Sequence, residues 1–269
     1  MQYETIRVED REGVRIITLD RPEARNALNS KMWEELCEAL DELDRDDSLR
    51  VAVIANTGPC FCAGADLKEL AAGTWHAPEG KEDWGFAGMT KRAFDKPLIA
   101  AVNGKALGGG TEIVLACDLT VASEDAVFGL PEPLRGLTAA GGGALVRIGQ
   151  QMPFKFAMEL VLTAEPIDAA KALSWGLVNY VMPSDQVLEK ALDLARSIVR
   201  CAPLSIAYSK RTIVESMGEP LAYPSEGWRK LEEYERITRG SEDAREGATQ
   251  TGSPLCGPPA VPLWAAGRR

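Results

Sequence analysis

The 269-residue chain contains a single histidine, His76, and this scarcity argues against several kinds of active site. Ser-His-Asp and Cys-His catalysis both need a histidine that a third group holds in place. His76 stands in a stretch of Thr, Trp, Ala and Pro residues, a composition typical of a loop. We therefore expect neither triad chemistry nor an essential histidine base in this protein.

The cysteines do not form a metal-binding pattern either. A structural zinc site needs two close pairs of ligands, or cysteines grouped with histidines. Only two of the six cysteines are close in sequence. We expect reduced thiols that act as small apolar side chains, and no metal site. The six are Cys37, Cys60, Cys62, Cys117, Cys201 and Cys256.

The chain also lacks a run of about 18 apolar residues, the length that a membrane span requires. Its first residues form neither the basic nor the apolar region of a secretory signal. The formal net charge of −10 disfavours binding to nucleic-acid phosphates. We expect a folded cytoplasmic protein with no nucleic-acid partner and no membrane association, since 45% of its residues are hydrophobic.

Short apolar runs are frequent in the first half of the chain and predict a parallel sheet. Residues 51–55 are apolar throughout, which is typical of a strand that is covered on both faces. Apolar residues recur at helical spacing over 30–43, and Ser30 can cap that helix. Strand, helix and strand make a βαβ unit with a right-handed crossover. The predicted strands are 15–19, 51–55, 97–102 and 119–122.

Helical periodicity dominates the second half. Segment 73–90 is rich in Gly, Pro and Trp without any period, and we predict a mobile loop there. Residues 247–269 show little pattern and predict an irregular or disordered tail. The predicted helices are 111–117, 153–163, 168–175, 184–201 and 203–216.

Three segments combine a strand end with small residues, and these are the candidate ligand-binding segments. They are 61–67, 103–112 and 128–132. Ligands of open α/β sheets bind beyond the carboxyl ends of strands. Three glycines, 108–110, precede the predicted helix, whose unpaired N–H groups suit a phosphate or a developing oxyanion. A tight turn or close helix packing explains the glycines equally well, and no phosphate-loop Lys-Ser or Lys-Thr follows them.

Glu112 and Glu132 are the candidate acid–base residues. Glu112 lies in the first turn of a helix that is apolar all round, so its carboxylate should line a cavity or be paired. Glu132 follows Pro131 on an apolar stretch. Two glutamates in one pocket can take different pKa values and divide acid and base work. The alternative is ion pairing, for example with Arg135 or Arg147.

Taken together, the motifs resemble those of the crotonase superfamily, the enoyl-CoA hydratase/isomerase family. The resemblance covers about residues 10–245 and depends on all the motifs occurring in order. They are the segment 18–28, Ala-Gly-Ala-Asp-Leu at 63–67, Gly-Gly-Gly-x-Glu at 108–112, Phe-Gly-x-Pro-Glu at 128–132 and the segment 169–179.

This resemblance implies an α/β crotonase (ClpP/crotonase-like) fold of repeated ββα units with a helical C-terminal trimerisation region. We expect a crotonase core with the acyl-CoA site over 1–200, a helical region over 201–246, and the irregular tail over 247–269. The family implies an acyl-CoA thioester substrate and no metal or redox cofactor, because CoA is part of the substrate. It also implies a homotrimer, or a hexamer of two trimers.

By motif position, the family's oxyanion hole falls on the backbone N–H groups of Ala65 and Gly109. Its two catalytic glutamates fall on Glu112 and Glu132, and having both implies hydration or dehydration of an enoyl-CoA. The usual family roles are water activation for Glu112 and proton supply to the α-carbon for Glu132. The implied substrate-binding residues are Glu23, Ala24, Ala27, Ala63, Gly64, Asp66, Leu67, Gly108 and Pro131.

Within the family, segments 84–90 and 241–247 are closest to carnitinyl-CoA dehydratases. A trimethylammonium substrate would need an aromatic or acidic pocket, which Trp75, Trp84 and Phe86 could supply. A Δ3-Δ2 enoyl-CoA isomerase is a second enzyme reading, and a catalytically silent acyl-CoA- or RNA-binding scaffold is a third. The sequence departs from the family pattern at 139–143 and after Gly247, so the pocket floor and the tail should differ.

Overall fold

The computed structural model describes residues 3–220 and 222–244, and the predicted tail at 247–269 lies outside them. The strands are β1 Ile6–Arg11, β2 Val14–Leu19, β3 Val51–Asn56, β4 Cys60–Cys62, β5 Leu98–Val102, β6 Lys105–Leu107, β7 Leu119–Ser123, β8 Val127–Gly129, β9 Ile167–Asp168 and β10 Tyr180–Met182. The α-helices are α1 Ser30–Arg45, α2 Leu67–Ala72, α3 Gly109–Ala116, α4 Ala144–Gln151, α5 Phe154–Thr163, α6 Ala169–Trp175, α7 Val187–Val199, α8 Pro203–Glu215 and α9 Glu226–Gly240. Short 3₁₀ helices are η1 Pro22–Ala24, η2 Glu82–Trp84, η3 Phe86–Gly88 and η4 Glu132–Arg135.

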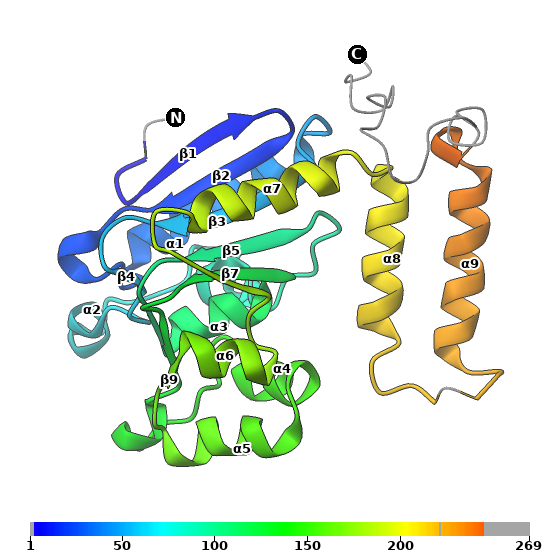
Figure 1. The fold of residues 1–269 in the computed structure, drawn as a ribbon. Coiled ribbons are helices and arrows are strands. Elements are labelled where there is room, and N and C mark those ends of the chain that lie inside the picture. The colour runs from blue at the N-terminus through cyan, green and yellow to red at the C-terminus, as the bar shows by residue number, and fades with distance from the viewer. Residues whose placement is uncertain (1–2, 221, 245–269) are drawn as a thin grey trace.

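A six-stranded sheet in the order β1-β2-β3-β5-β7-β10 forms the main layer (Figure 1). Only β1 is antiparallel to its neighbour, and the other pairs are parallel. Helix α1 connects β2 to β3, and these two strands pair in parallel, so the predicted βαβ unit is confirmed. The central strands β3 and β5 are almost wholly buried, and such strands need cover on both faces of the sheet.

The two faces of β3 belong to two different apolar cores. Val51 and Val53 pack in the cluster that includes Ala191 of α7. Ala52 and Ile54 point to the opposite face and join the larger cluster, which includes α1 and α3. This alternation follows from the two-residue period of a strand. It explains why every position of 51–55 is apolar.

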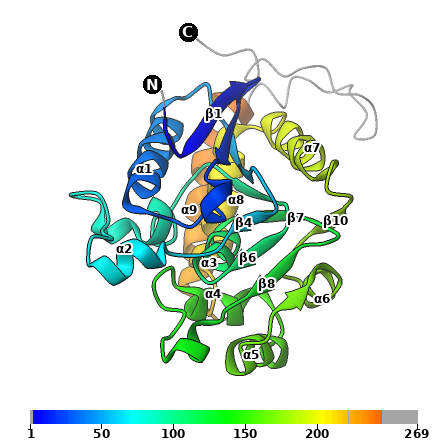
Figure 2. The same cartoon turned by 90° about the vertical axis from the view of Figure 1, so that its left-hand side faces the viewer.

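A second, four-stranded sheet in the order β4-β6-β8-β9 holds the candidate ligand-binding segments (Figure 2). Strands β4, β6 and β8 pair in parallel. Each therefore ends at the same edge, and the segments 63–67, 108–112 and 130–132 follow those ends. The sheet thus places three distant parts of the sequence together.

Helix boundaries differ from the predicted ones at two informative places. Asn29, not Ser30, caps α1, because its side chain accepts the Met32 N–H at 2.9 Å. The Ser30 hydroxyl instead donates to the carboxylate of Glu69 at 2.8 Å. Helix α3 begins at Gly109, two residues before the predicted start, so the glycines form its first turn rather than a loop before it.

Helices α8 and α9 form a hairpin that stands beside the rest of the chain (Figure 1). Within the hairpin the rings of Tyr208 and Tyr234 lie 4.8 Å apart. The α8 cation Lys210 contacts Asp118 at 2.7 Å and thereby ties the hairpin to the sheet body. Helical periodicity predicted α8 but not α9, which lies within the region 201–246 that the family resemblance implied to be helical. No helix in the described part of the chain is both long and apolar enough to cross a membrane.

Four of the cysteines lie buried as free thiols, and Cys201 is a free thiol on the surface. Cys256 lies outside the described residues. Burial raises the pKa of the Cys62 thiol to about 12, so this side chain stays neutral and packs as an apolar group.

Candidate active site

Glu112 is the most deeply buried candidate carboxylate, with 3% of its surface exposed. It lies in the first turn of α3, and one carboxylate oxygen accepts the Ala144 N–H at 3.2 Å. Gly142 packs directly on this side chain: a Cβ atom at Gly142 would lie 2.6 Å from Glu112 Oε2. Segment 139–143, where the sequence departs from the family pattern, therefore packs against the Glu112 carboxylate.

Glu132 begins η4, immediately after Pro131, and is half-buried. Its Oε1 lies 2.9 Å from the position that a Cβ on Gly108 would take. Its Oε2 is buried and finds no hydrogen-bond partner among the described residues. Burial raises the pKa of Glu132, and the negative charge of Glu112 raises it further. This carboxyl group therefore keeps its proton to a higher pH than an ordinary glutamate does.

Gly108 contacts both glutamates. The Gly108 carbonyl accepts the Glu112 N–H at 3.0 Å, while the Cα of Gly108 faces the carboxyl group of Glu132. Gly109, next along the chain, is the first residue of α3. The structure therefore brings both predicted glutamates to the N-terminal end of one helix.

Ala65 and Gly109, the two predicted oxyanion donors, lie in neighbouring segments. Gly64 has a φ of +95° and packs so closely that a Cβ there would lie 3.3 Å from the Gly109 nitrogen. Within residues 3–220 and 222–244, neither the Ala65 nor the Gly109 N–H has a protein acceptor. Two backbone donors are thus available beside the glutamates, at the positive end of the α3 dipole.

The predicted binding residues of the first motif lie alongside those of the second. Leu28 pairs with Ala65 in an isolated parallel bridge, and the Leu28 N–H donates to Gly64 at 2.8 Å. The Ala63 N–H donates to Arg25 at 3.1 Å. These contacts bring 25–28, which includes Ala27, against 63–66. Glu23 and Ala24 precede that stretch in η1, and Glu23 is exposed.

Asp66 has a structural explanation that the sequence left open. Its carboxylate caps α2 by accepting the Lys68 N–H at 3.0 Å, and it pairs with Arg21 at 3.2 Å. Burial opposes its ionisation, but these donors outweigh that effect and lower the pKa of Asp66. Leu67, the next residue, begins α2 and is largely exposed.

Asn26 is a positioning residue within the first motif, the segment 18–28. It is fully buried, and its side-chain amide donates to the carbonyls of Thr57 and Cys60 at 2.9 and 2.7 Å. These bonds tie the first motif to the segment between β3 and β4. The signal available in the sequence was a lone Asn next to apolar residues, which is too weak to assign such a role.

Phe86 is the feature of the site that the sequence placed wrongly. Segment 73–90 is irregular, as predicted, but residues 86–90 are buried. A Cβ on Gly109 would lie 2.3 Å from Cζ of Phe86, so this ring covers the start of α3. Phe86 also packs against Trp33 and Trp75 at centroid distances of 6.0 and 6.3 Å. An apolar aromatic wall therefore lies beside the Gly109 N–H.

Trp84 lies between two cations. Lys81 Nζ is 3.5 Å from the ring centroid, and the Arg92 guanidinium carbon is 4.0 Å from it. Both cations also contact Asp41 of α1, at 2.7 and 2.9 Å. This cluster anchors the irregular segment to α1 and occupies Trp84 with the protein's own charges.

Arg147 of α4 does not pair with a glutamate at the distance of a salt bridge. Its guanidinium donates to the backbone carbonyls of Gly142, at 3.2 Å, and Thr90. The negative charge of Glu112 still favours its protonated form, while burial lowers the pKa of Arg147. The predicted alternative of a Glu112–Arg147 ion pair is therefore a through-space interaction, with both groups also held by the backbone.

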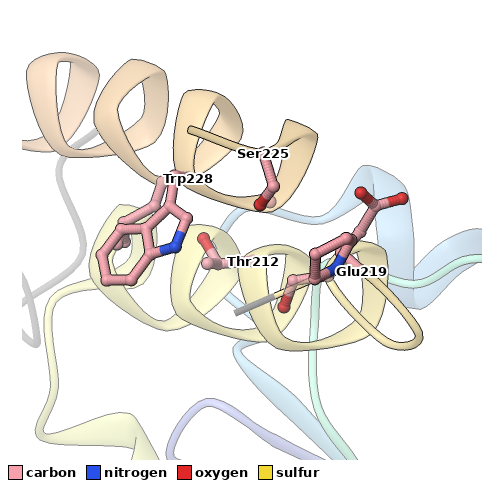
Figure 3. A pocket seen from close by; sticks show the side chains of 8 residues that line it. Thr212, Glu219, Ser225 and Trp228 are labelled. Atoms are coloured by element: carbon pink, nitrogen blue, oxygen red, sulfur yellow. The ribbon is translucent and has the colours of Figure 1, made fainter. Parts of the chain in front are cut away.

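A separate pair of cavities lies between α8 and α9. The one in Figure 3, of about 160 Å³, has Thr212 of α8 and Trp228 of α9 on its walls. The neighbouring one, of about 430 Å³, shares Thr212 and Leu231 with it. None of the predicted site residues lines either cavity, so they are features of the hairpin and not of the site around α3.

Comparison with known proteins supports one family. The family described as Enoyl-CoA hydratase/isomerase matches residues 9–249. The chain is 40% identical over 216 residues to an enoyl-CoA hydratase of Mycobacterium tuberculosis, covering 78% of this chain and 80% of the relative. It is 41% identical over 239 residues to a carnitinyl-CoA dehydratase of Salmonella typhi, covering 86% and 88%.

Solved structures agree with the sequence comparison. The crystal structure of an enoyl-CoA hydratase from Mycobacterium marinum superimposes with a TM-score of 0.84 at 41% identity, covering 91% of this chain and 94% of the other. Backbones this similar imply the same fold, and the sheet order and helices described above are those of that fold.

Proposed function

Because the chain belongs to the enoyl-CoA hydratase/isomerase family and has its crotonase fold, we propose that it adds or removes water across the 2,3 double bond of an enoyl-CoA thioester. It is a hydro-lyase in this proposal, and its substrate is an acyl-CoA. The observation that carries it is the pair Glu112 and Glu132, which both contact Gly108, next to two backbone N–H groups without an acceptor among the described residues.

The oxyanion donors are the N–H groups of Ala65 and Gly109. Adding water at the β-carbon develops negative charge on the thioester oxygen, and donors fixed before the reaction stabilise that charge without reorganising. The N-terminal end of α3 adds its positive dipole. The ring of Phe86 on Gly109 keeps water away from this position, which strengthens the electrostatic interaction.

The two glutamates divide the proton transfers. In hydration, Glu112 takes a proton from water as the oxygen attacks the β-carbon, and Glu132 gives a proton to the α-carbon. The reverse transfers serve dehydration. The raised pKa of Glu132 supports its role as the group that holds a proton. The Ala144 N–H holds the Glu112 carboxylate in place.

Every step of this scheme uses groups of the chain and the substrate, so the proposal needs no metal or redox cofactor. CoA enters as part of the substrate. We further propose a homotrimer or hexamer, with α8 and α9 in the helical region 201–246 taking part in the assembly. The core at 1–200 and a cytoplasmic location remain predictions.

Steady-state assays test the proposal against the isomerase alternative. Crotonyl-CoA hydration should exceed conversion of a 3-enoyl-CoA to its 2-enoyl isomer by the same preparation. A higher rate with the 3-enoyl substrate would favour a Δ3-Δ2 isomerase, in which one glutamate moves a proton between carbons. Binding of acyl-CoA without turnover of either substrate would indicate a silent scaffold.

The aromatic residues bear on the carnitine alternative. A trimethylammonium group binds to an open aromatic face or a spare carboxylate. Trp84 already stacks with Lys81 and Arg92, and Phe86 is buried against Gly109. We therefore expect crotonyl-CoA to be turned over with a higher kcat/KM than crotonobetainyl-CoA, and the reverse order would establish the carnitine reaction.

A further inference from the structure

The guanidinium of Arg147 connects the backbone at Thr90 to the backbone at Gly142, 52 residues further along the chain. It extends from α4 and is half-buried. One nitrogen donates to the Thr90 carbonyl and another to the Gly142 carbonyl at 3.2 Å. A planar guanidinium with several fixed donors can hold two carbonyls at once, which an ammonium group does far less well.

The Thr90 end of this bridge leads to the proposed oxyanion hole. Thr90 is fully buried, and its N–H donates to the Phe86 carbonyl at 3.3 Å. The ring of Phe86 in turn lies on Gly109, whose N–H is a proposed oxyanion donor. A shift of Thr90 would therefore move the ring that covers this donor.

The Gly142 end leads to the proposed base. Gly142 packs on the Glu112 side chain, with 2.7 Å between a Cβ placed at Gly142 and the Glu112 Cβ. Two residues further, the Ala144 N–H donates to Glu112 Oε1. The orientation of the carboxylate thus depends on the backbone that Arg147 holds.

We propose that Arg147 is a positioning residue for the hydration reaction. Its two hydrogen bonds set the relative placement of the Gly142 backbone that packs on Glu112 and the Phe86 ring that lies on Gly109. This inference rests on the proposed function, since it assigns Glu112 the role of base.

Two substitutions test this role. Arg147→Met removes both hydrogen bonds, while Arg147→Lys keeps the cation and loses the two-carbonyl bridge. We expect kcat for crotonyl-CoA hydration to fall about 10- to 100-fold in Arg147→Met, because displacements near 1 Å cost about that much. KM should stay within about twofold of the wild type, since Arg147 acts on the walls of the site through the backbone.

Arg147→Lys should lose less of the rate than Arg147→Met, because an ammonium group can still hold one of the two carbonyls. Lys155→Met, which removes an exposed cation on the neighbouring helix α5, is the matched control and should change neither kcat nor KM. Thermal melting of each variant checks that the fold is intact, and KM should change less than kcat.

If wild-type protein hydrates crotonyl-CoA and both Arg147 variants keep its kcat, the inference is wrong while the proposed function stands. If KM rises in Arg147→Met by as large a factor as kcat falls, Arg147 acts on substrate binding, and the positioning role is overturned. A wild-type enzyme that hydrates no enoyl-CoA would overturn the proposed function and the inference with it.

Discussion

The surroundings of α3 and the α8–α9 hairpin depart from ordinary burial in opposite directions. Around α3, charged groups are buried: Glu112 is 3% exposed, and Glu132 has a buried oxygen without a hydrogen-bond partner in the described residues. On the hairpin, apolar side chains are exposed, with Ile213 at 62% and Val214 at 54%. Both arrangements cost free energy in an isolated chain, so each calls for a reason beyond the stability of that chain.

The difference lies in what completes each region. Around α3 the chain itself supplies close packing, through Phe86 on Gly109 and Gly142 on Glu112. In the proposed function, the buried charge takes part in the reaction, because a low-dielectric site strengthens its interactions with a substrate. The hairpin instead has cavities and uncovered apolar residues. We interpret it as a surface that a second copy of the chain completes.

The largest expected effect tests the buried charges directly. Glu112→Gln and Glu132→Gln should each lower kcat for crotonyl-CoA hydration by about 10²–10⁴-fold, the usual contribution of a general acid or base. The fold should survive, because Gln is nearly isosteric with Glu. Circular dichroism and steady-state kinetics of purified variants measure both quantities.

Glu165→Gln, at an exposed carboxylate between α5 and β9, serves as the control and should keep wild-type kinetics. A Glu112 or Glu132 variant that retains more than about half of wild-type turnover would remove that residue from the acid–base scheme.

A second prediction concerns the packing that positions the buried charge. Gly142→Ala should lower kcat by about 10- to 100-fold, because its Cβ would lie 2.6 Å from Glu112 Oε2 and displace the carboxylate. Gly141→Ala adds the same methyl group one residue earlier, where the nearest atom of Glu112 is 3.9 Å away. It should be nearly silent. Equal rates for the two variants would show that the wall on Glu112 does not control its position.

A third prediction concerns the hairpin. We expect a trimer or hexamer in light scattering at micromolar concentration, and Ile213→Asp should shift it toward the monomer. Burying such a side chain contributes about 1.5–3 kcal/mol, or at least a tenfold change in association for each contact. Gln186→Asp adds the same charge at an exposed position before α7 and should leave the assembly unchanged. A monomeric wild type would contradict the comparison of the two regions.

The smallest expected effect is on stability. Because the pKa of Glu132 is higher in the folded protein than its ordinary value of 4.5, the folded state binds this proton more tightly than the unfolded state. The contribution of Glu132 to wild-type stability should therefore fall as the pH rises above 4.5. Glu132→Gln lacks this loss, so its melting temperature should exceed that of the wild type by a few degrees at pH 8 and approach it at pH 4.5.

Melting curves of the two proteins at both pH values measure this difference. A constant difference between them at all pH values would mean that the pKa of Glu132 is the same in the folded and unfolded states. The result would also remove the stability cost that we assign to its buried oxygen.

Local patterns in the sequence predicted the elements that local forces control. The all-apolar run 51–55 predicted a doubly covered parallel strand, and β3 contributes to cores on both faces. Helical spacing predicted α1, and helices α5 to α8 begin and end within a few residues of the predicted bounds. Each of these features depends on the period of its own side chains, which the sequence displays directly.

Local patterns did not predict three features: helix α9, the burial of residues 86–90 and the capping residue of α1. Helix α9 combines many charged residues with few apolar ones, so its pattern does not resemble a core-facing helix. Residues 86–90 show no period, yet they are buried. The ring of Phe86 occupies the space that a side chain at Gly109 would need, and a local pattern cannot show this contact. The cap of α1 went to Asn29 instead of Ser30, because Ser30 bonds to Glu69 on a helix that folds against it.

The sequence by itself determined the strand–helix succession, the positions of the small residues and the two glutamates, and through its motifs the family. These are properties of residues taken one segment at a time. Only the tertiary structure decided that Gly108 contacts both Glu112 and Glu132, that Phe86 covers Gly109, and that Arg147 joins the carbonyls of Thr90 and Gly142. Such contacts depend on close packing between distant segments, and that packing is set by the whole core rather than by any local pattern.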